Sequence, residues 1–147
     1  MELYSHEYFM NEALKQAKAA FEDGEIPVGA VIVCRNKVIA RAYNQTETLN
    51  DVTAHAEMLA ITSAANYLGA KYLVDCKLYV TLEPCVMCGG ALYWSQISEV
   101  HYAASDPRRG YLQSNTGILH PKTKVYSGTM GSESEALLLQ FFQNLRK

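Results

Sequence analysis

Two short motifs, far apart in the chain, constrain the fold more than any other feature. The first contains His55 and, two residues later, Glu57; the second is a Pro-Cys-x-x-Cys motif that supplies Cys85 and Cys88. A structural Zn²⁺ site normally has four protein ligands, whereas a catalytic site has three and keeps one position open. The fold must therefore bring one His and two Cys to one point, with the Glu left over as an acid/base group.

Length and composition predict a single domain over residues 1–147. The chain is 49% hydrophobic and 19% charged, which is typical of a globular protein that buries a full core. It has no apolar run long enough to span a membrane, and its first residues are acidic and polar, unlike a secretory signal. We therefore expect a cytoplasmic location, where Cys34 and Cys76 remain small buried thiols.

Charge is distributed unevenly along the chain. The formal net charge is −2, but residues 105–147 carry +3 and the residues before them −5. The overall balance argues against indiscriminate binding of nucleic acid. The basic last third could provide a local footprint for a polyanion, although a solvated surface explains the same charges.

Hydrophobic periodicity predicts an alternation of helices and strands. A helix is expected over residues 5–22, then a hairpin of strands 28–34 and 38–43, a helix from an N-cap at Thr53 to Leu68, a strand over 77–82, a helix from Pro84, strands 99–104 and 124–127, and a last helix opened by a Ser132-x-x-Glu135 capping box. This order indicates an α/β fold of three layers, α-β-α, with helices on both faces of one mixed five-stranded sheet.

The predicted helix starts suit the proposed metal ligands. Cys85 and Cys88 lie one turn apart, where a helix N-terminus favours thiolate over thiol. Bound zinc lowers the pKa of water to about 7, and Glu57 is placed to move protons between that water and a substrate. Alone, His55 could be a core histidine and Glu57 a favourable charge in a first helical turn. Together with the two Cys, they indicate a catalytic zinc site.

The combined pattern His-x-Glu and Pro-Cys-x-x-Cys is the signature of zinc nucleobase deaminases. With residues 25–31, Asn44, residues 51–57 and residues 78–85, the chain resembles the cytidine deaminase-like superfamily, and most of all the bacterial tRNA-specific adenosine deaminases. The resemblance implies one Zn²⁺ per subunit and a homodimer. It also implies conversion of adenosine to inosine at the wobble position, in the anticodon loop of an arginine tRNA.

The resemblance also implies roles for individual residues. His55, Cys85 and Cys88 match the zinc ligands, and Glu57 matches the proton shuttle. Three further positions match contacts to the substrate or its surroundings: Asn44 with the flipped base, Asp106 near the backbone and ribose of the target nucleotide, and, with Phe141 and Phe142, Arg146 on a last helix that faces RNA.

Two segments depart from the adenosine deaminase pattern. Residues 107–113 replace a Lys-containing stretch, and residues 91–94 (Ala-Leu-Tyr-Trp) are similar to the guanine deaminases. A deaminase of a free base or nucleoside, such as guanine or cytosine/cytidine, is therefore the alternative, because the same metal centre serves all of them. A zinc-stabilised binding module is a third reading, which would require Cys34 or Cys76 as a fourth ligand.

Overall fold

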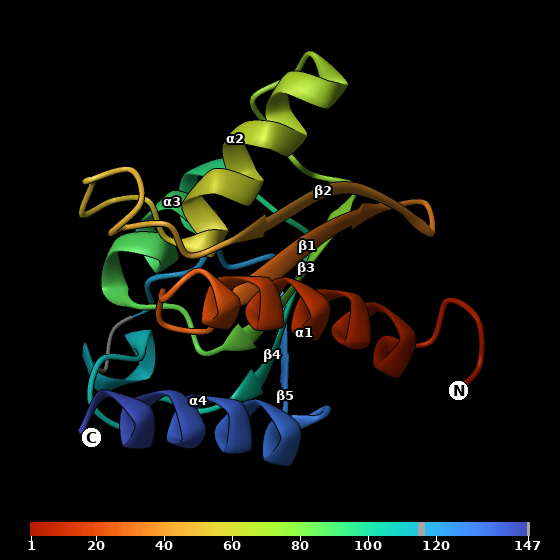
Figure 1. Ribbon diagram of the computed structural model, residues 1–147. Helices are drawn as coiled ribbons and strands as arrows, with labels where there is room; N and C mark the ends of the chain where they lie inside the picture. The colour runs from red at the N-terminus through yellow and green to blue at the C-terminus, as the bar shows by residue number, and fades with distance from the viewer. Residues whose placement is uncertain (115–116, 147) are drawn as a thin grey trace.

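The computed structural model describes residues 1–114 and 117–146, in which a mixed sheet lies between two layers of helices (Figure 1). The strands are β1 (Gly29–Cys34), β2 (Lys37–Tyr43), β3 (Cys76–Leu82), β4 (Glu99–Ala104) and β5 (Lys124–Ser127). The helices are α1 (His6–Glu22), α2 (Ala56–Leu68), α3 (Val86–Ser95) and α4 (Gly131–Leu145), with a 3₁₀ turn, η1, at Tyr111–Ser114.

The strand order is β2-β1-β3-β4-β5. β1 is antiparallel to both β2 and β3, whereas β3, β4 and β5 run parallel to one another. β3 therefore lies at the centre of the sheet, between the hairpin and the parallel strands. The segment that follows it carries the Pro-Cys-x-x-Cys motif.

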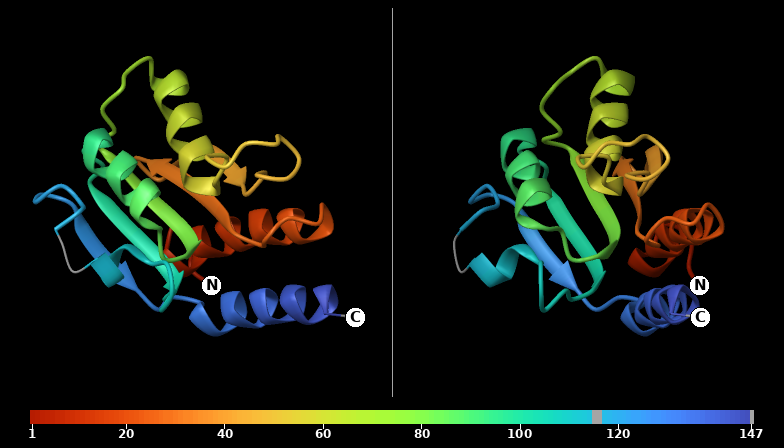
Figure 2. Two further views of the ribbon diagram at one scale, coloured as in Figure 1. Left: turned by 90° about the vertical axis from the view of Figure 1, so that its left-hand side faces the viewer. Right: turned by 60° about the vertical axis from the view of Figure 1, so that its left-hand side comes forward.

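The helices cover both faces of the sheet, as Figure 2 shows: α1 and α4 lie on one face, α2 and α3 on the other. Each face has its own apolar core, one packed beneath α2 and α3 and one beneath α1. β1 is buried along almost its whole length because helices cover both of its sides. The predicted three-layer α-β-α fold with a mixed five-stranded sheet is confirmed.

Local signals explain several of the element boundaries. The Ser5 side chain accepts a hydrogen bond from the backbone N–H of Tyr8 at 3.0 Å and caps α1. Arg35 and Asn36, with φ of 52° and 63°, form the tight turn of the hairpin. Positive φ at both central positions matches the right-handed twist of the two strands, so a two-residue connection is enough.

The predicted starts of three helices, α2, α3 and α4, were wrong. Thr53 does not cap α2, because its hydroxyl and its backbone N–H both bind the Asp51 carboxylate at 2.8 Å; the helix begins two residues after Ala54. α3 begins at Val86, after Pro84 and Cys85.

The capping box at the start of the last helix does not form. α4 begins at Gly131 after Met130, which makes no side-chain cap. Ser132, the predicted cap, therefore lies inside the helix. Ser134, two residues further on, is buried, and its hydroxyl donates to the carbonyl of Thr81 at 2.5 Å. The serine therefore holds the helix against the end of β3.

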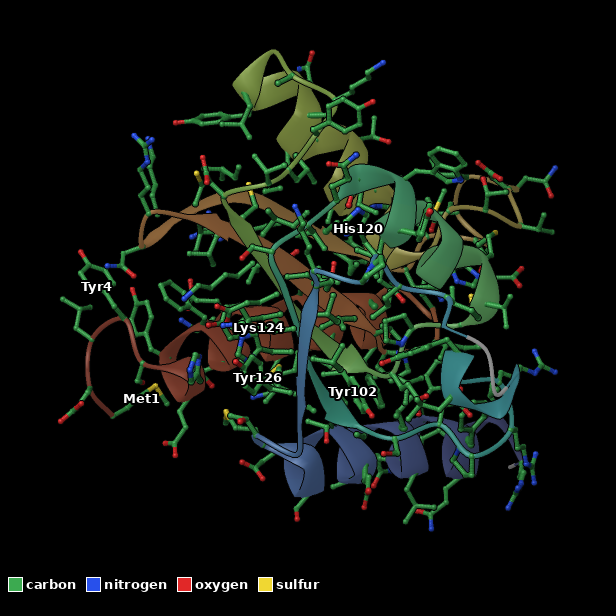
Figure 3. All side chains as sticks on the ribbon, turned by 180° about the vertical axis from the view of Figure 1, so that it is seen from behind. Met1, Tyr4, Tyr102, His120, Lys124 and Tyr126 are labelled. Carbon is green, nitrogen blue, oxygen red and sulfur yellow. The ribbon has the colours of Figure 1, made fainter. Side chains whose placement is uncertain are left out.

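β5 forms one edge of the sheet. Figure 3 shows this edge from behind, with Lys124 and Tyr126 on the last strand. All of β5 is exposed, which makes it the most solvated strand described. Among the helices of the described ranges, none combines the length and apolarity that crossing a bilayer requires.

Candidate active site

Two helix starts bring the predicted metal ligands together. His55 occupies the N-cap position of α2 and Cys85 that of α3, while Cys88 lies in the first turn of α3. α2 and α3 pack against each other on the same face of the sheet (Figure 2). As a result, Nδ1 of His55 lies 3.6 Å from Sγ of Cys85 and 3.5 Å from Sγ of Cys88.

These separations fit a zinc ion. Zinc binds sulfur at about 2.3 Å and imidazole nitrogen at about 2.0–2.1 Å with tetrahedral angles, which places the two donor atoms about 3.5 Å apart. The three ligand atoms lie within 4.8 Å of one another, and within the described ranges no other residue joins this group. Three protein ligands around one point leave a fourth position for a water or a substrate.

Neither of the remaining cysteines completes this site. Cys34 pairs with Cys76 across β1 and β3, at the end of β3 opposite the one that leads to Cys85. The binding-module reading required one of them as a fourth ligand. The geometry therefore favours the open, catalytic type of site.

Electrostatics at the site favour the deprotonated form of Cys85. A hydrogen bond from the Cys88 thiol, a further one from His55 and the backbone N–H of Cys88 together lower the pKa of Cys85 to about 4. The same contact with Cys85 raises the pKa of His55. A thiolate is the form that binds metal, so the helix start prepares one ligand before an ion arrives.

Glu57 lies beside the ligands in the first turn of α2 and is 4% exposed. Burial raises the pKa of this carboxyl group to about 7. A group whose pKa lies near neutrality both accepts and donates protons readily, which is the property required of a general acid/base. Glu57 is also one of the residues that line the open cavity, next to the space that a substrate would fill.

The cavity above the ligands has a volume of about 840 Å³. Its wall is built from the segment after β2, the segment after β4 and one side of α4, and includes Ile26, Val28, Asn44, Thr46, Asp51, His55, Glu57, Cys85, Asp106, Arg108, Arg109, Leu138 and Phe142. The volume lies within the range of small-molecule sites, and the cavity is open toward the solvent. Apolar, acidic and basic side chains all contribute to its surface.

Two predicted substrate residues line this cavity. Asn44 is largely buried; its Nδ2 donates to the carbonyl of Ile26 and its Oδ1 accepts from the N–H of Thr46, both at 3.3 Å. Because an amide has two donors and two lone pairs, one of each stays available. Asp106 uses Oδ1 to accept the N–H groups of Arg108 and Arg109 at 3.1 Å.

The residues of the last helix that were predicted to face RNA lie in three different environments. Phe141 is buried and its ring contacts Phe21, with 5.8 Å between centroids. Phe142 is 40% exposed and lines the cavity. Arg146 ends the helix in an exposed position, and the described part of the cavity wall does not include it.

Sequence reasoning gave no role to Glu25, a second buried glutamate near the cavity. Its carboxylate is fully buried and accepts three hydrogen bonds: from the N–H of Glu47 at 3.1 Å, and from the N–H and hydroxyl of Thr48 at 2.7 Å. Burial by itself raises the pKa of Glu25, but these bonds outweigh it and lower the pKa below its usual value. Glu25 therefore anchors the segment 44–53 as an ionised carboxylate.

Glu83 anchors the opposite wall in the same way. Its Oε1 accepts the N–H of Asp106 at 3.0 Å, and its Oε2 accepts the N–H of Leu112 at 3.1 Å. A Cβ at Gly110 would lie 2.3 Å from the carboxyl carbon of Glu83, so the segment approaches this closely because it has glycine there. Glu83 therefore orients the segment that follows β4.

Three ligand atoms around an open position, with a buried carboxyl group beside them, form the arrangement of a catalytic zinc site. The model of the cytidine and deoxycytidylate deaminase zinc-binding region matches residues 3–104. The chain belongs to this deaminase family.

Individual relatives resemble nearly the whole chain. A tRNA-specific adenosine deaminase of Aquifex aeolicus is 47% identical over 144 residues, which cover 95% of either chain. A solved structure from a study of A-to-I editing by tRNA:A34 deaminases at the wobble position has a TM-score of 0.83 and 43% identity, over 88% of this chain and 98% of its own. A guanine deaminase structure from Nitrosomonas europaea has a TM-score of 0.81 and 27% identity, over 92% of this chain and 83% of its own.

Proposed function

We propose that this protein is a zinc-dependent tRNA adenosine deaminase, which converts adenosine to inosine at the wobble position of an arginine tRNA. The observation that carries the proposal is the high identity to tRNA-specific adenosine deaminases over nearly the whole chain. The His55, Cys85 and Cys88 cluster and the cavity above it supply the chemistry that this reaction needs.

In this proposal, His55, Cys85 and Cys88 hold one Zn²⁺ and Glu57 moves the protons. When bound, the metal lowers the pKa of a water to about 7, so a nucleophile is available at neutral pH. Glu57 would take a proton from the attacking water and give it to N1 of adenine, and would then give the second proton of that water to the 6-amino group. A C–O bond forms at C6, the C–N bond breaks, and inosine and ammonia are released.

The cavity wall suits a flipped nucleotide. The free N–H and lone pair of Asn44 can bind the edge of the base. Phe142 offers an exposed aromatic ring, and Arg108 and Arg109 offer guanidinium groups for phosphates on the other wall. Asp106 fits a position near the ribose, and Arg146 a more distant contact with the anticodon loop.

We also propose a cytoplasmic homodimer. Val86, Met87 and Trp94 of α3 are 53%, 36% and 75% exposed. Met87 and Trp94 lie two turns apart on one side of the helix and Val86 is next to Met87, so they form an apolar stripe facing the solvent. A second copy would cover this stripe. Sedimentation should give a dimer for the wild type and a monomer for Trp94→Glu; a wild-type monomer at micromolar concentration would refute the dimer.

The test is an ammonia-release assay on the zinc-loaded protein. Substrates are the anticodon stem-loop of an arginine tRNA with adenosine at the wobble position, a stem-loop of another tRNA given adenosine there, guanine, cytosine and cytidine. We expect turnover of the arginine stem-loop alone, lost in Glu57→Gln and kept in Glu7→Gln, which alters an exposed glutamate at the start of α1.

The second candidate is deamination of a free base, favoured by the structural likeness to guanine deaminase. Turnover of guanine or cytosine with the RNA unchanged would replace the substrate but keep the mechanism. Equal turnover of both stem-loops would remove the arginine specificity. No turnover of any substrate would refute the proposed function.

A further inference from the structure

Cys34 and Cys76 lie outside the metal site and have no part in the proposed reaction. Cys34 is the last residue of β1 and Cys76 is the first residue of β3. The antiparallel register of these strands places the two cysteines directly opposite each other. Both are free thiols.

The backbone hydrogen bonds show which kind of strand pair this is. The carbonyl of Cys76 accepts from the N–H of Ser98 at 3.0 Å, and the N–H of Cys76 donates to the carbonyl of Leu73 at 3.0 Å. Both groups of Cys76 are thus engaged away from β1, so Cys34 and Cys76 are a non-hydrogen-bonded pair. Such pairs have Cα atoms about 4.5 Å apart and bring side chains closest together. This separation lies inside the range of about 4.4–6.8 Å for disulfides.

Both side chains lie on the same face of the sheet. Cys76 belongs to the apolar core beneath α2, and Cys34 packs against that core. They differ in access to solvent: Cys76 is fully buried, whereas Cys34 is partly exposed. Burial, together with the neighbouring Cys34, raises the pKa of Cys76 to about 12. Cys34 is therefore the thiol that meets a reagent first.

We propose that Cys34 and Cys76 form a redox-modification site, which closes to a cross-strand disulfide when a small-molecule disulfide acts as the oxidant. The Cys34 thiolate attacks the oxidant, forms a mixed disulfide and releases one thiolate. Cys76 then loses its proton, attacks the sulfur of Cys34 and releases the second thiolate. Two protein thiols are oxidised to one disulfide, and the small-molecule disulfide is reduced to two thiols.

The position of the pair defines what its oxidation changes. Cys76 begins β3, whereas the segment with Cys85 follows the other end of that strand. The bond would close a loop across β2 and α2 and restrict the unfolded chain, which raises Tm by about 5–15 °C. The metal ligands and the cavity stay as they are, so turnover should change by less than about twofold. The site is thus a reversible stabiliser that is separate from the chemistry.

The experiment equilibrates the zinc-loaded protein in glutathione buffers of increasing oxidised fraction. Peptide mass mapping then identifies linked cysteines, and Tm, zinc content and ammonia release are measured on the same samples. We expect a peptide linking Cys34 to Cys76, a higher Tm, unchanged zinc and unchanged turnover. Reduction should reverse all of the changes. Cys34→Ser and Cys76→Ala should each lack the linked peptide and the rise in Tm.

Three results would overturn the inference. The first is glutathione attached to Cys34 without a bond to Cys76 at any buffer composition. The second is a linked peptide that involves only Cys85 or Cys88, accompanied by loss of zinc. The third is no oxidation of the wild type even in fully oxidised glutathione. Because the central result comes from the wild-type protein, a variant that folds poorly does not affect it.

Discussion

Two buried glutamates near the same cavity have opposite acid–base behaviour. Glu57 lies beside the metal ligands, and burial raises its pKa to about 7. Glu25 is likewise inaccessible to solvent but lies nearer the surface of the protein; burial again acts to raise its pKa, yet hydrogen bonds from Thr48 and Glu47 lower it below the usual value. The depth of burial and the number of donors around the carboxylate therefore decide the protonation state together.

The difference separates a chemical role from a structural one. A carboxyl group with few fixed donors can exchange protons near neutral pH, which suits Glu57 for acid/base work. A carboxylate held by three donors stays ionised and serves as an anchor, which suits Glu25 for holding the cavity wall. Glu83 accepts two backbone N–H groups and holds the segment on the opposite wall of the cavity.

Glu57→Gln should have the largest effect on activity. The amide keeps the size of the side chain but cannot move protons, so turnover should fall by at least about 10²–10⁴-fold. Ammonia release measures the loss, and metal analysis should find wild-type zinc content. Residual activity within tenfold of the wild type would remove Glu57 from the proton-transfer role.

Glu25→Gln should mainly reduce stability. The amide group places N–H donors against the N–H groups of Glu47 and Thr48, so the free energy of unfolding should fall by about 2–4 kcal/mol. Urea unfolding measures the change, with exposed Glu22→Gln as the matched control. Equal stability of the two variants would mean that Glu25 does not anchor the wall.

The pH dependence of this loss follows from the pKa of Glu25. The folded-state value is lower than the ordinary value of 4.5, so the carboxylate contributes stability above pH 4.5. That contribution disappears as the pH falls from 4.5 through the folded-state pKa. The stability gap between wild type and Glu25→Gln should therefore be full at pH 7 and shrink below pH 4.5, as urea unfolding at several pH values would show. A gap independent of pH would contradict the ionised anchor.

Gly110→Ala should have the smallest effect of the three substitutions. The added Cβ would lie 2.3 Å from the carboxyl carbon of Glu83 and push the carboxylate from its N–H donors. Overpacking of this kind lowers the free energy of unfolding by about 1–3 kcal/mol. Gly90→Ala is the control, because a Cβ there meets open space. Thermal unfolding should give a lower Tm for Gly110→Ala than for Gly90→Ala. A higher Tm for Gly110→Ala would show that Glu83 does not need this close approach.

The metal cluster was predictable from sequence because ligand identity and spacing are local properties. His55, Cys85 and Cys88 each lie at or near a helix start that the hydrophobic pattern also indicated, although both predicted starts were wrong by two residues. One cap failed because a nearby side chain competes for it: Asp51 binds Thr53. Ser132, the predicted cap of the last helix, lies inside α4, which begins one residue earlier at Gly131.

The anchoring glutamates were harder to recognise. Glu25 and Glu83 each precede a proline within two residues and stand next to a strand, but nothing local distinguishes a buried acceptor from an exposed charge. Their donors lie more than twenty residues away in the chain, at Thr48 and Asp106. Only the folded arrangement brings these N–H groups to the two buried carboxyl groups, which would be costly to bury without partners.

The choice of backbone N–H groups as partners has a consequence for how such proteins diversify. Among the described residues, Glu83 binds its segment through N–H groups, and two of the three bonds to Glu25 are also to N–H groups. Most residues of the two segments can therefore be exchanged without loss of the anchor, since every residue except proline has an N–H. A lineage could replace most residues at the rim of the cavity and acquire a new substrate while its metal centre stays unchanged.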